Sequence, residues 1–220
     1  LWSHGKILPR IKSRCRLMSF SVVILAAGKG TRMKSEKPKV LHTVGNASML
    51  HHVMEVAKKA GAEETVIVAG HQAELISEAA KRKSPDAQIV IQEEQLGTGH
   101  AVKQAERLLG KSGKDILILY GDVPFVKSET ISKLIKARKT CDIAVLGFDA
   151  KHPGMYGRLI SNGENVIGIV EAKDATQEQL NISLCNSGVI LGRADLIFDL
   201  IAKIGRDNAS KEFYLTDCIE

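Results

Sequence analysis

Short runs of apolar residues alternate with longer stretches of mixed character along this chain. Five such runs cover residues 21–27, 65–69, 88–91, 115–120 and 143–148. Consecutive apolar residues without polar alternation are typical of strands that are buried on both faces of a parallel sheet. The first run stops abruptly at Gly28, where a polar loop begins.

The stretches between the runs have the length and apolar spacing of helices. We expect helices over residues 49–60, 73–83, 99–109 and 128–139. Ser48 is a suitable N-cap for the first helix, and Gly61 is a suitable stop. Strands that alternate with helices predict an α/β fold with a doubly wound, mostly parallel, Rossmann-like sheet. In such sheets, ligands bind at the carboxyl ends of the strands.

After about residue 150 the pattern changes, because glycines interrupt short strand-like pieces. Residues 161–164 read Ser-Asn-Gly-Glu, which is a turn sequence. We expect a hairpin or a small mixed β subdomain here, then a strand at 189–191 and a helix over 195–203. The polar tips at residues 171–174 and 186–188 suit hydrogen bonds to a polar ligand, or are surface loops.

The formal net charge of +6 is concentrated at one end of the chain. Residues 1–17 hold five Lys or Arg residues and no acid, so the remainder is close to neutral. We expect residues 1–17 to form a disordered basic extension, with a targeting presequence as the alternative. Residues 18–220 then form the folded domain, which lacks the basic face that binding of nucleic acid requires.

The sequence supports neither a membrane protein nor a protein with a cysteine-ligated metal site. No apolar run approaches the length that spans a bilayer, so we expect no membrane insertion. The four cysteines are far apart and form no CxxC pair, which favours reduced thiols in a cytoplasmic protein.

A glycine-rich, cationic loop follows the first strand. Residues 28–33 read Gly-Lys-Gly-Thr-Arg-Met, and Lys39 follows Pro38. Glycines let backbone N–H groups approach phosphates, and cations neutralise them, so the loop predicts a polyphosphate site. The spacing is not that of a P-loop, and Met33 stands where the dinucleotide fingerprint needs a small residue. A purely structural glycine turn is the alternative.

Two further motifs follow predicted strands. Asp122 lies just after the run that ends at Tyr120, where a carboxylate is suited to Mg²⁺ bound to phosphates. Its alternative role is to cap the turn before Pro124. Residues 95–100 read Gln-Leu-Gly-Thr-Gly-His and come after Gln92, whose amide can read a base edge. The alternative for this segment is an ordinary capped loop.

In this order, the motifs resemble those of sugar-nucleotide pyrophosphorylases. The motifs at residues 156–158, 169–175 and 186–188 are similar to the uridyltransferase domain of a bacterial bifunctional family. That family joins N-acetylglucosamine-1-phosphate uridyltransferase to glucosamine-1-phosphate acetyltransferase. The resemblance runs from about residue 19 to residue 220. It implies a nucleotidyltransferase fold whose sugar-binding part covers about residues 150–192.

The resemblance also implies a role for each matching position. The implied catalytic residues are Arg32, Lys39 and Asp122, with Asp122 as the ligand of a Mg²⁺ cofactor. The implied substrate-binding residues are Leu25, Ala26, Ala27, Gly28, Lys39, Gln92, Gly97, Thr98, Tyr120, Gly121, Asp122, Gly157, Glu171 and Asn186. The segment 25–28 matches contacts to the nucleotide. Gln92, Gly97 and Thr98 match uracil and ribose contacts, and the last three residues of the list match contacts to the N-acetyl sugar.

The implied reaction joins UTP and N-acetylglucosamine 1-phosphate to give UDP-N-acetylglucosamine and pyrophosphate, for the synthesis of peptidoglycan and lipopolysaccharide. The family has a second magnesium-ligating Asn and a trimer-forming β-helix that carries the acetyltransferase. Neither is found before residue 220, so we expect a domain that is incomplete at its C-terminus. A related enzyme for another base or sugar and a non-catalytic nucleotide-binding module stay open. Met33 disfavours a nicotinamide oxidoreductase.

Overall fold

The computed structural model describes residues 5–10, 19–28, 30, 33, 35–163 and 165–219. Its main sheet contains β1 (Gly5–Arg10), β2 (Phe20–Ala26), β5 (Glu64–Ala69), β6 (Gln88–Ile91), β7 (Asp115–Tyr120), β8 (Ile143–Asp149), β9 (Arg158–Asn162), β10 (Asn165–Val170) and β11 (Leu184–Arg193). The helices are α1 (Met49–Lys59), α2 (Ala73–Lys83), α3 (Thr98–Lys103), α4 (Glu106–Leu109), α5 (Ser128–Arg138), α6 (Gln177–Leu180) and α7 (Ala194–Ile201). Shorter elements are η2 (Lys39–Leu41), η3 (Leu215–Ile219) and the small pair β3 (Thr43–Val44) and β4 (Ala47–Ser48).

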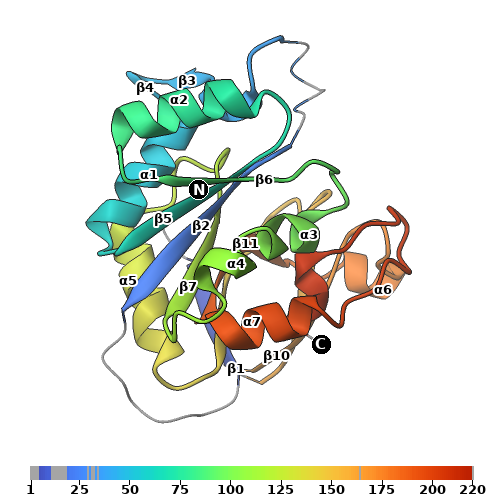
Figure 1. The fold of residues 1–220 in the computed structure, drawn as a ribbon. Helices are drawn as coiled ribbons and strands as arrows, with labels where there is room; N and C mark the ends of the chain where they lie inside the picture. The colour runs from blue at the N-terminus through green and yellow to red at the C-terminus, as the bar shows by residue number, and fades with distance from the viewer. Residues whose placement is uncertain are drawn as a thin grey trace.

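Helices cover both faces of one mixed sheet (Figure 1). The strand order is β1-β8-β11-β7-β2-β5-β6, with β9 beside β11 and β10 beside β9. Strand β2 is parallel to both β7 and β5, and β5 is parallel to β6. The α/β fold class with a parallel core is therefore confirmed.

Strand β11 differs from the expectation of a short strand at residues 189–191. It runs from Leu184 to Arg193 and is antiparallel to both β7 and β8, so it separates them. The pairing with β8 shifts register between Asn186 and Ile190. The polar residues of this irregular part interrupt the apolar run, which is why the sequence pattern predicted only its second half.

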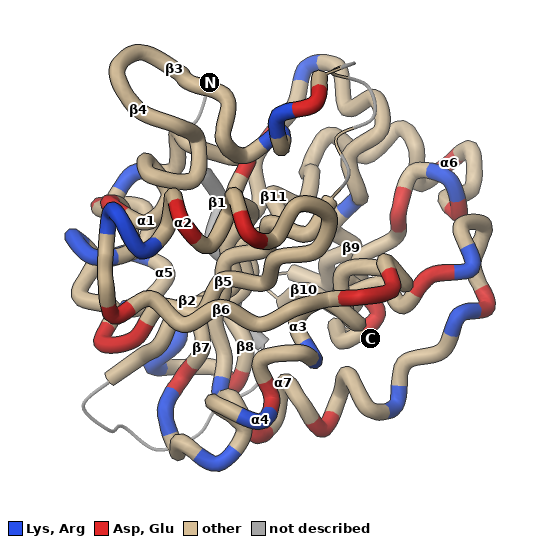
Figure 2. The backbone as a smooth tube through the Cα atoms, turned by 45° about the horizontal axis from the view of Figure 1, so that its top comes forward, with Lys and Arg blue, Asp and Glu red and all other residues tan. Residues whose placement is uncertain are grey.

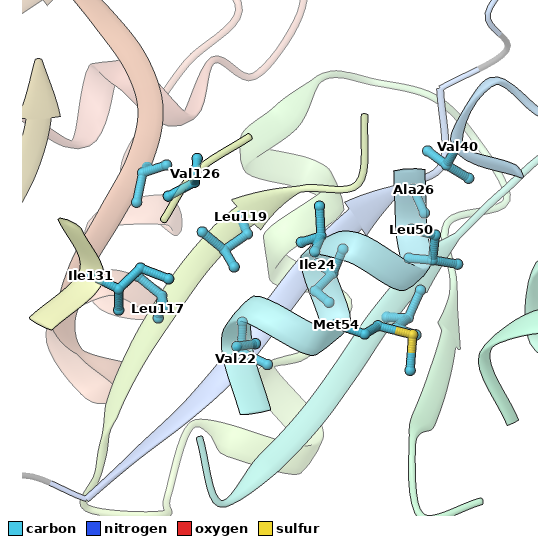
Figure 3. Close-up of a cluster of buried hydrophobic side chains, with 14 of the residues drawn as sticks. Val22, Ile24, Ala26, Val40, Leu50, Met54, Leu117, Leu119, Val126 and Ile131 are labelled. Carbon is cyan, nitrogen blue, oxygen red and sulfur yellow. The ribbon is translucent and has the colours of Figure 1, made fainter. Parts of the chain in front are cut away.

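The sheet has a separate apolar core on each face. Alternate residues of β2 enter different cores: Val22 and Ile24 pack with helices α1, α2 and α5, and Val23 and Leu25 pack with α3, α4 and α7. Figure 3 shows the first core, where Leu50 and other residues of α1 lie over β2 and β7. All residues of β2 are buried, as expected for a strand covered on both faces.

Most predicted helices and turns have the predicted bounds within two residues. Ser48 caps α1 by accepting a hydrogen bond from the His51 N–H at 3.2 Å, and β9 and β10 form the predicted hairpin around Gly163. The helix expected over 99–109 is divided into α3 and α4. The N–H groups of Gln104 and Ala105 bond to carbonyls three residues back, which breaks the α-helical pattern.

Of residues 1–17, the structure describes only 5–10, which form β1 antiparallel to β8. The division of the chain into an extension and a domain stays a prediction. Acidic and basic residues alternate around the outside of the fold, while the central strands are largely uncharged (Figure 2). Within the described residues, no helix has the length and apolar character needed to cross a membrane.

A buried ion pair at the amino end of β7 provides a test of this packing. Arg138 of α5 donates to Asp115 at 2.9 Å, and both residues are 7% exposed. We expect Arg138→Leu to lower the free energy of unfolding by about 3–5 kcal/mol, because Asp115 is left buried without its counter-charge. Urea denaturation measures this. Arg82→Leu removes an exposed ion pair with Glu78 and serves as the control, with a much smaller expected loss.

Candidate functional site

The strand order places a topological switch point between β2 and β7. From β2 the chain proceeds to β5 and β6 on one side, and from β7 it continues toward β8 on the other side. Leu25 pairs with Tyr120, so the segments that follow the two strands leave the sheet side by side. This is the position where open α/β sheets bind ligands.

A cavity of about 490 Å³ lies at this switch point. We call it the switch-point cavity. Ten residues named from the sequence line it: Leu25, Ala26, Ala27, Gly28, Lys39, Gln92, Gly97, Thr98, Tyr120 and Asp122. These ten residues come from four separate segments of the chain, and the fold brings the four segments together around one cavity.

The cationic loop and the predicted metal ligand meet inside this cavity. Lys39 Nζ lies 2.6 Å from Asp122 Oδ2, although the residues are 83 positions apart. Lys39 begins η2, whose next two residues, Val40 and Leu41, are buried and anchor it. The structure thus brings one cation of the predicted loop, Lys39, next to Asp122. Arg32 lies outside the described residues.

Gln92 lines the cavity and is held by the fold. The residue is only 3% exposed, and its Nε2 donates to the Gly97 carbonyl at 3.1 Å. Gly97 has φ +113°, and a Cβ there would lie 2.5 Å from the Phe213 carbonyl oxygen. Only glycine allows both this backbone conformation and this close approach.

A C-terminal segment, residues 212–216, holds the 95–100 loop in place. Phe213 donates from its N–H to the Leu96 carbonyl at 2.8 Å and accepts from the Gly99 N–H at 2.8 Å. The N–H of Leu215 donates to Thr98 Oγ1 at 3.0 Å. No sequence signal predicts this partner, because nothing in residues 212–216 marks them as neighbours of a loop more than a hundred positions earlier.

Three predicted residues outside the cavity lining form a second group, which we call the Glu171 cluster. It contains Gly157, Glu171 and Asn186. The Asn186 N–H donates to the Gly157 carbonyl at 2.8 Å, and a Cβ on Gly157 would lie 3.3 Å from Glu171 Oε1. Thr216, which the sequence reasoning missed, donates from Oγ1 to Glu171 Oε1 at 3.2 Å.

Tyr120 connects the cavity and the Glu171 cluster. Its ring packs on Gly188, where a Cβ would lie 2.5 Å from a ring carbon, and the Gly188 N–H donates to Asn186 Oδ1 at 2.9 Å. Burial raises the pKa of Tyr120, and the negative charge of Glu171 adds to the shift. Because a phenol with a raised pKa stays neutral near pH 7, Tyr120 is an uncharged part of the cavity wall.

Gly121 is the remaining predicted position. Its N–H donates to the Leu25 carbonyl at 2.9 Å, which continues the β2–β7 pairing past the end of β7. A Cβ there would lie 3.1 Å from the Leu25 oxygen and from Val40. Gly121 therefore lets the segment that carries Asp122 pack tightly on the end of β2.

Asp122 has the chemistry of a magnesium ligand. One oxygen is held by Lys39, and the other has no hydrogen-bond partner among the described residues. The same residues contain no group of three or more His, Cys, Asp or Glu side chains that could hold a metal alone. Magnesium often binds one or two carboxylates and completes its coordination with waters and substrate phosphates. The residues present fit that mode of binding.

Residues 22–180 match the MobA-like NTP transferase domain family. The chain belongs to this family. The switch-point cavity therefore lies in an NTP transferase domain, at the edge of the sheet where the phosphate-binding loop was predicted.

Curated relatives agree with this assignment. The chain is 50% identical over 203 residues to the bifunctional protein GlmU of Ruegeria sp. (strain TM1040), covering 92% of this chain and 45% of that protein. It is 48% identical over 199 residues to the bifunctional protein GlmU of Cereibacter sphaeroides (strain ATCC 17025 / ATH 2.4.3), covering 90% of this chain and 44% of that protein. This NTP transferase chain thus spans somewhat less than half the length of these relatives.

Solved structures support the fold. A UDP-glucose pyrophosphorylase complexed with UDP-glucose superposes with a TM-score of 0.68 at 21% identity, covering 92% of this chain and 85% of the other. HddC from Yersinia pseudotuberculosis gives a TM-score of 0.64 at 24% identity, covering 90% and 84%. At these identities the likeness describes the shared architecture of the NTP transferase fold.

Gly97→Ala tests the close docking of the 95–100 loop. The variant combines a left-handed backbone with a clash against the Phe213 carbonyl, so we expect a larger loss of unfolding free energy than for Gly113→Ala. Gly113 has φ +67° with nothing within 4 Å, so alanine there costs only the backbone term, about 1–2 kcal/mol. Urea denaturation of both variants makes the comparison, and equal losses would contradict the tight contact.

The Glu171 carboxyl gives a prediction about pH. Burial raises the pKa of Glu171 above its ordinary value of 4.5, while the Thr216 hydrogen bond opposes this shift. The folded state then binds this proton more tightly than the unfolded state, so the free energy of unfolding falls as pH rises from 4.5 through the raised pKa. Glu171→Gln removes the ionisation.

We therefore expect the stability of Glu171→Gln relative to the wild type to increase with pH across that window. Urea titrations at several pH values measure it. Glu178→Gln changes an exposed acid on α6 and is the matched control, for which the difference should stay flat.

Proposed function

We propose that this domain transfers a uridylyl group from UTP to N-acetylglucosamine 1-phosphate, releasing pyrophosphate and forming UDP-N-acetylglucosamine. The observation that carries the proposal is the meeting of Lys39 and Asp122 in one cavity at the β2–β7 switch point. A cation and a metal-binding carboxylate at this place suit a triphosphate. The similarity to GlmU proteins supports the choice of base and sugar.

In this mechanism, a phosphate oxygen of the sugar phosphate attacks the α-phosphorus of UTP in line with the departing pyrophosphate. The attacking oxygen is already anionic near neutral pH, so the reaction needs neither a protein nucleophile nor a strong general base. Catalysis then rests on positioning and on stabilising charge. Asp122 would hold Mg²⁺, which when bound neutralises phosphate charge and orients the phosphates of the substrates.

Each part of the site has a task in this reaction. Lys39 leaves Asp122 to contact phosphate oxygens, and Arg32 supplies the second cation of the phosphate loop. Gln92 and Thr98 hold the nucleoside end of UTP in the cavity. The Glu171 cluster lies beyond Tyr120 and binds the sugar, because a carboxylate and an amide can hydrogen-bond its hydroxyl and acetamido groups.

We further propose that the protein is cytoplasmic. The family resemblance assigns acetyl transfer and trimer formation to the β-helix of full-length relatives, and we propose neither property for residues 1–220. They do not affect the test of the site described above.

The direct test is release of pyrophosphate from UTP and N-acetylglucosamine 1-phosphate, with and without Mg²⁺. We expect turnover that depends on the metal. The same assay with other nucleoside triphosphates, and with glucose 1-phosphate, distinguishes a related enzyme for another base or sugar. Tight UTP binding in calorimetry without release of pyrophosphate would instead indicate a non-catalytic nucleotide-binding module.

Removal of the phosphate-binding cations should slow the reaction. We expect Lys39→Ala and Arg32→Ala each to lower kcat/KM at least about a hundredfold, as loss of a charge contact in the transition state typically costs about 3 kcal/mol. Lys37→Ala removes an exposed cation of the same loop and is the matched control, for which we expect at most a few-fold change. A few-fold effect for Arg32→Ala would remove that residue from the mechanism.

Asp122→Asn keeps the shape of the side chain but weakens its hold on a divalent cation. We expect the Mg²⁺ concentration for half-maximal activity to rise sharply, because an amide oxygen lacks the negative charge of the carboxylate. A titration of activity against Mg²⁺ measures the change. An unaltered titration curve would argue against Asp122 as the ligand.

A further inference from the structure

The amide of Gln92 is fixed in one orientation at the end of the cavity. Its Nε2 lies 3.1 Å from the Gly97 carbonyl and 3.0 Å from His100 Nδ1. A carbonyl can only accept a hydrogen bond, so the amide atom facing Gly97 must be the nitrogen. The other amide atom, Oε1, has no hydrogen-bond partner among the described residues, and Gln92 lines the cavity.

His100 uses the second hydrogen of this amide. A buried amide nitrogen carries two hydrogens, and Gly97 takes only one. His100 Nδ1 therefore accepts the other, which places the hydrogen of the neutral imidazole on Nε2. Gln104 Nε2 lies 3.2 Å from this second ring nitrogen and donates to the His100 carbonyl at 3.0 Å. A neutral imidazole has one acceptor nitrogen, so only one of the two amides can donate to the ring. Gln92 is 3% exposed and cannot turn to water, whereas the side chain of Gln104 is only partly buried and can, so we assign the ring acceptor to Gln92.

The ring of His100 is itself held by the fold. It lies on α3, and its centroid is 6.4 Å from that of Phe213 in the 212–216 segment. The guanidinium group of Arg206 lies over the Phe213 ring, 5.5 Å from its centroid. His100 does not line the cavity, so it acts on a ligand only through Gln92.

We propose that His100 is a positioning residue for base selection, which keeps Gln92 Oε1 directed at the bound nucleobase as a hydrogen-bond acceptor. An acceptor at this point matches a pyrimidine that carries N3–H, as uracil does. Cytosine presents an unprotonated N3 at the same place, and two acceptors repel each other. The inference rests on the proposed uridylyl transfer and extends it to the origin of the base preference.

The experiment compares kcat/KM for UTP, CTP and dUTP in the wild type and two variants of His100. His100→Leu removes one of the two acceptors that hold the Gln92 amide nitrogen, so one of its hydrogens loses its partner and the amide is held less firmly. We expect the UTP-to-CTP ratio to fall by about tenfold or more, since a buried mismatched polar contact is lost. His100→Asn keeps an amide oxygen close to the place of Nδ1 and should restore most of the preference.

The UTP-to-dUTP ratio is an internal control, because these nucleotides differ only in the ribose 2′-hydroxyl. General loosening of the site would change both ratios, whereas the role proposed for His100 changes only the first. His51→Leu is the matched control variant: His51 Nε2 contacts the Ala79 carbonyl at 2.8 Å between α1 and α2, away from the cavity. It should leave the UTP-to-CTP ratio unchanged.

Calorimetry with UTP and CTP separates this inference from the proposed function. If the wild type binds UTP better than CTP but releases no pyrophosphate, uridylyl transfer is wrong, and the effect of His100→Leu on the ratio of affinities still tests the base contact. An unchanged ratio in His100→Leu overturns the inference while leaving uridylyl transfer intact. A wild type without preference for UTP over CTP overturns it as well.

Discussion

The parallel pairing of β2 with β7 is the constraint on which the site depends. The two strands are far apart in the sequence, but their pairing brings the segments after Leu25 and Tyr120 to the same edge of the sheet. Gly121 extends this contact by donating to the Leu25 carbonyl at 2.9 Å. Lys39 and Asp122 meet because these ends are adjacent, and both faces of the strand pair are covered by apolar cores.

The second part of the site is built from later, antiparallel structure. Strand β11 enters between β7 and β8 and brings Asn186 beside Gly157. The 212–216 segment then touches both halves: Leu215 binds Thr98 of the cavity, and Thr216 binds Glu171. The 212–216 segment therefore links the switch-point cavity to the Glu171 cluster through a few hydrogen bonds, and such a network holds both in a fixed relation.

Lys39 and Asp122 neutralise each other in the cavity. Their side chains are 42% and 28% exposed, so water reaches and screens both charges. A pair of this kind contributes little to stability. This makes it easy to exchange: the lysine can turn to phosphate oxygens, and the carboxylate can turn to a cation. By contrast, the Arg138–Asp115 pair at the opposite end of β7 is buried, so water does not screen its charges.

The sequence by itself determined the fold class and most elements, because these depend on local patterns such as apolar runs and caps like Ser48. Short motifs after the strands, together with the family resemblance that they carry, also named ten of the residues that line the cavity. The tertiary structure alone decided the place of β11, the division of α3 from α4, and the contacts of Thr216 and His100. These depend on contacts between residues far apart or on the direction of a single amide. Local propensity carries no information about either, since only packing brings such groups within hydrogen-bond distance.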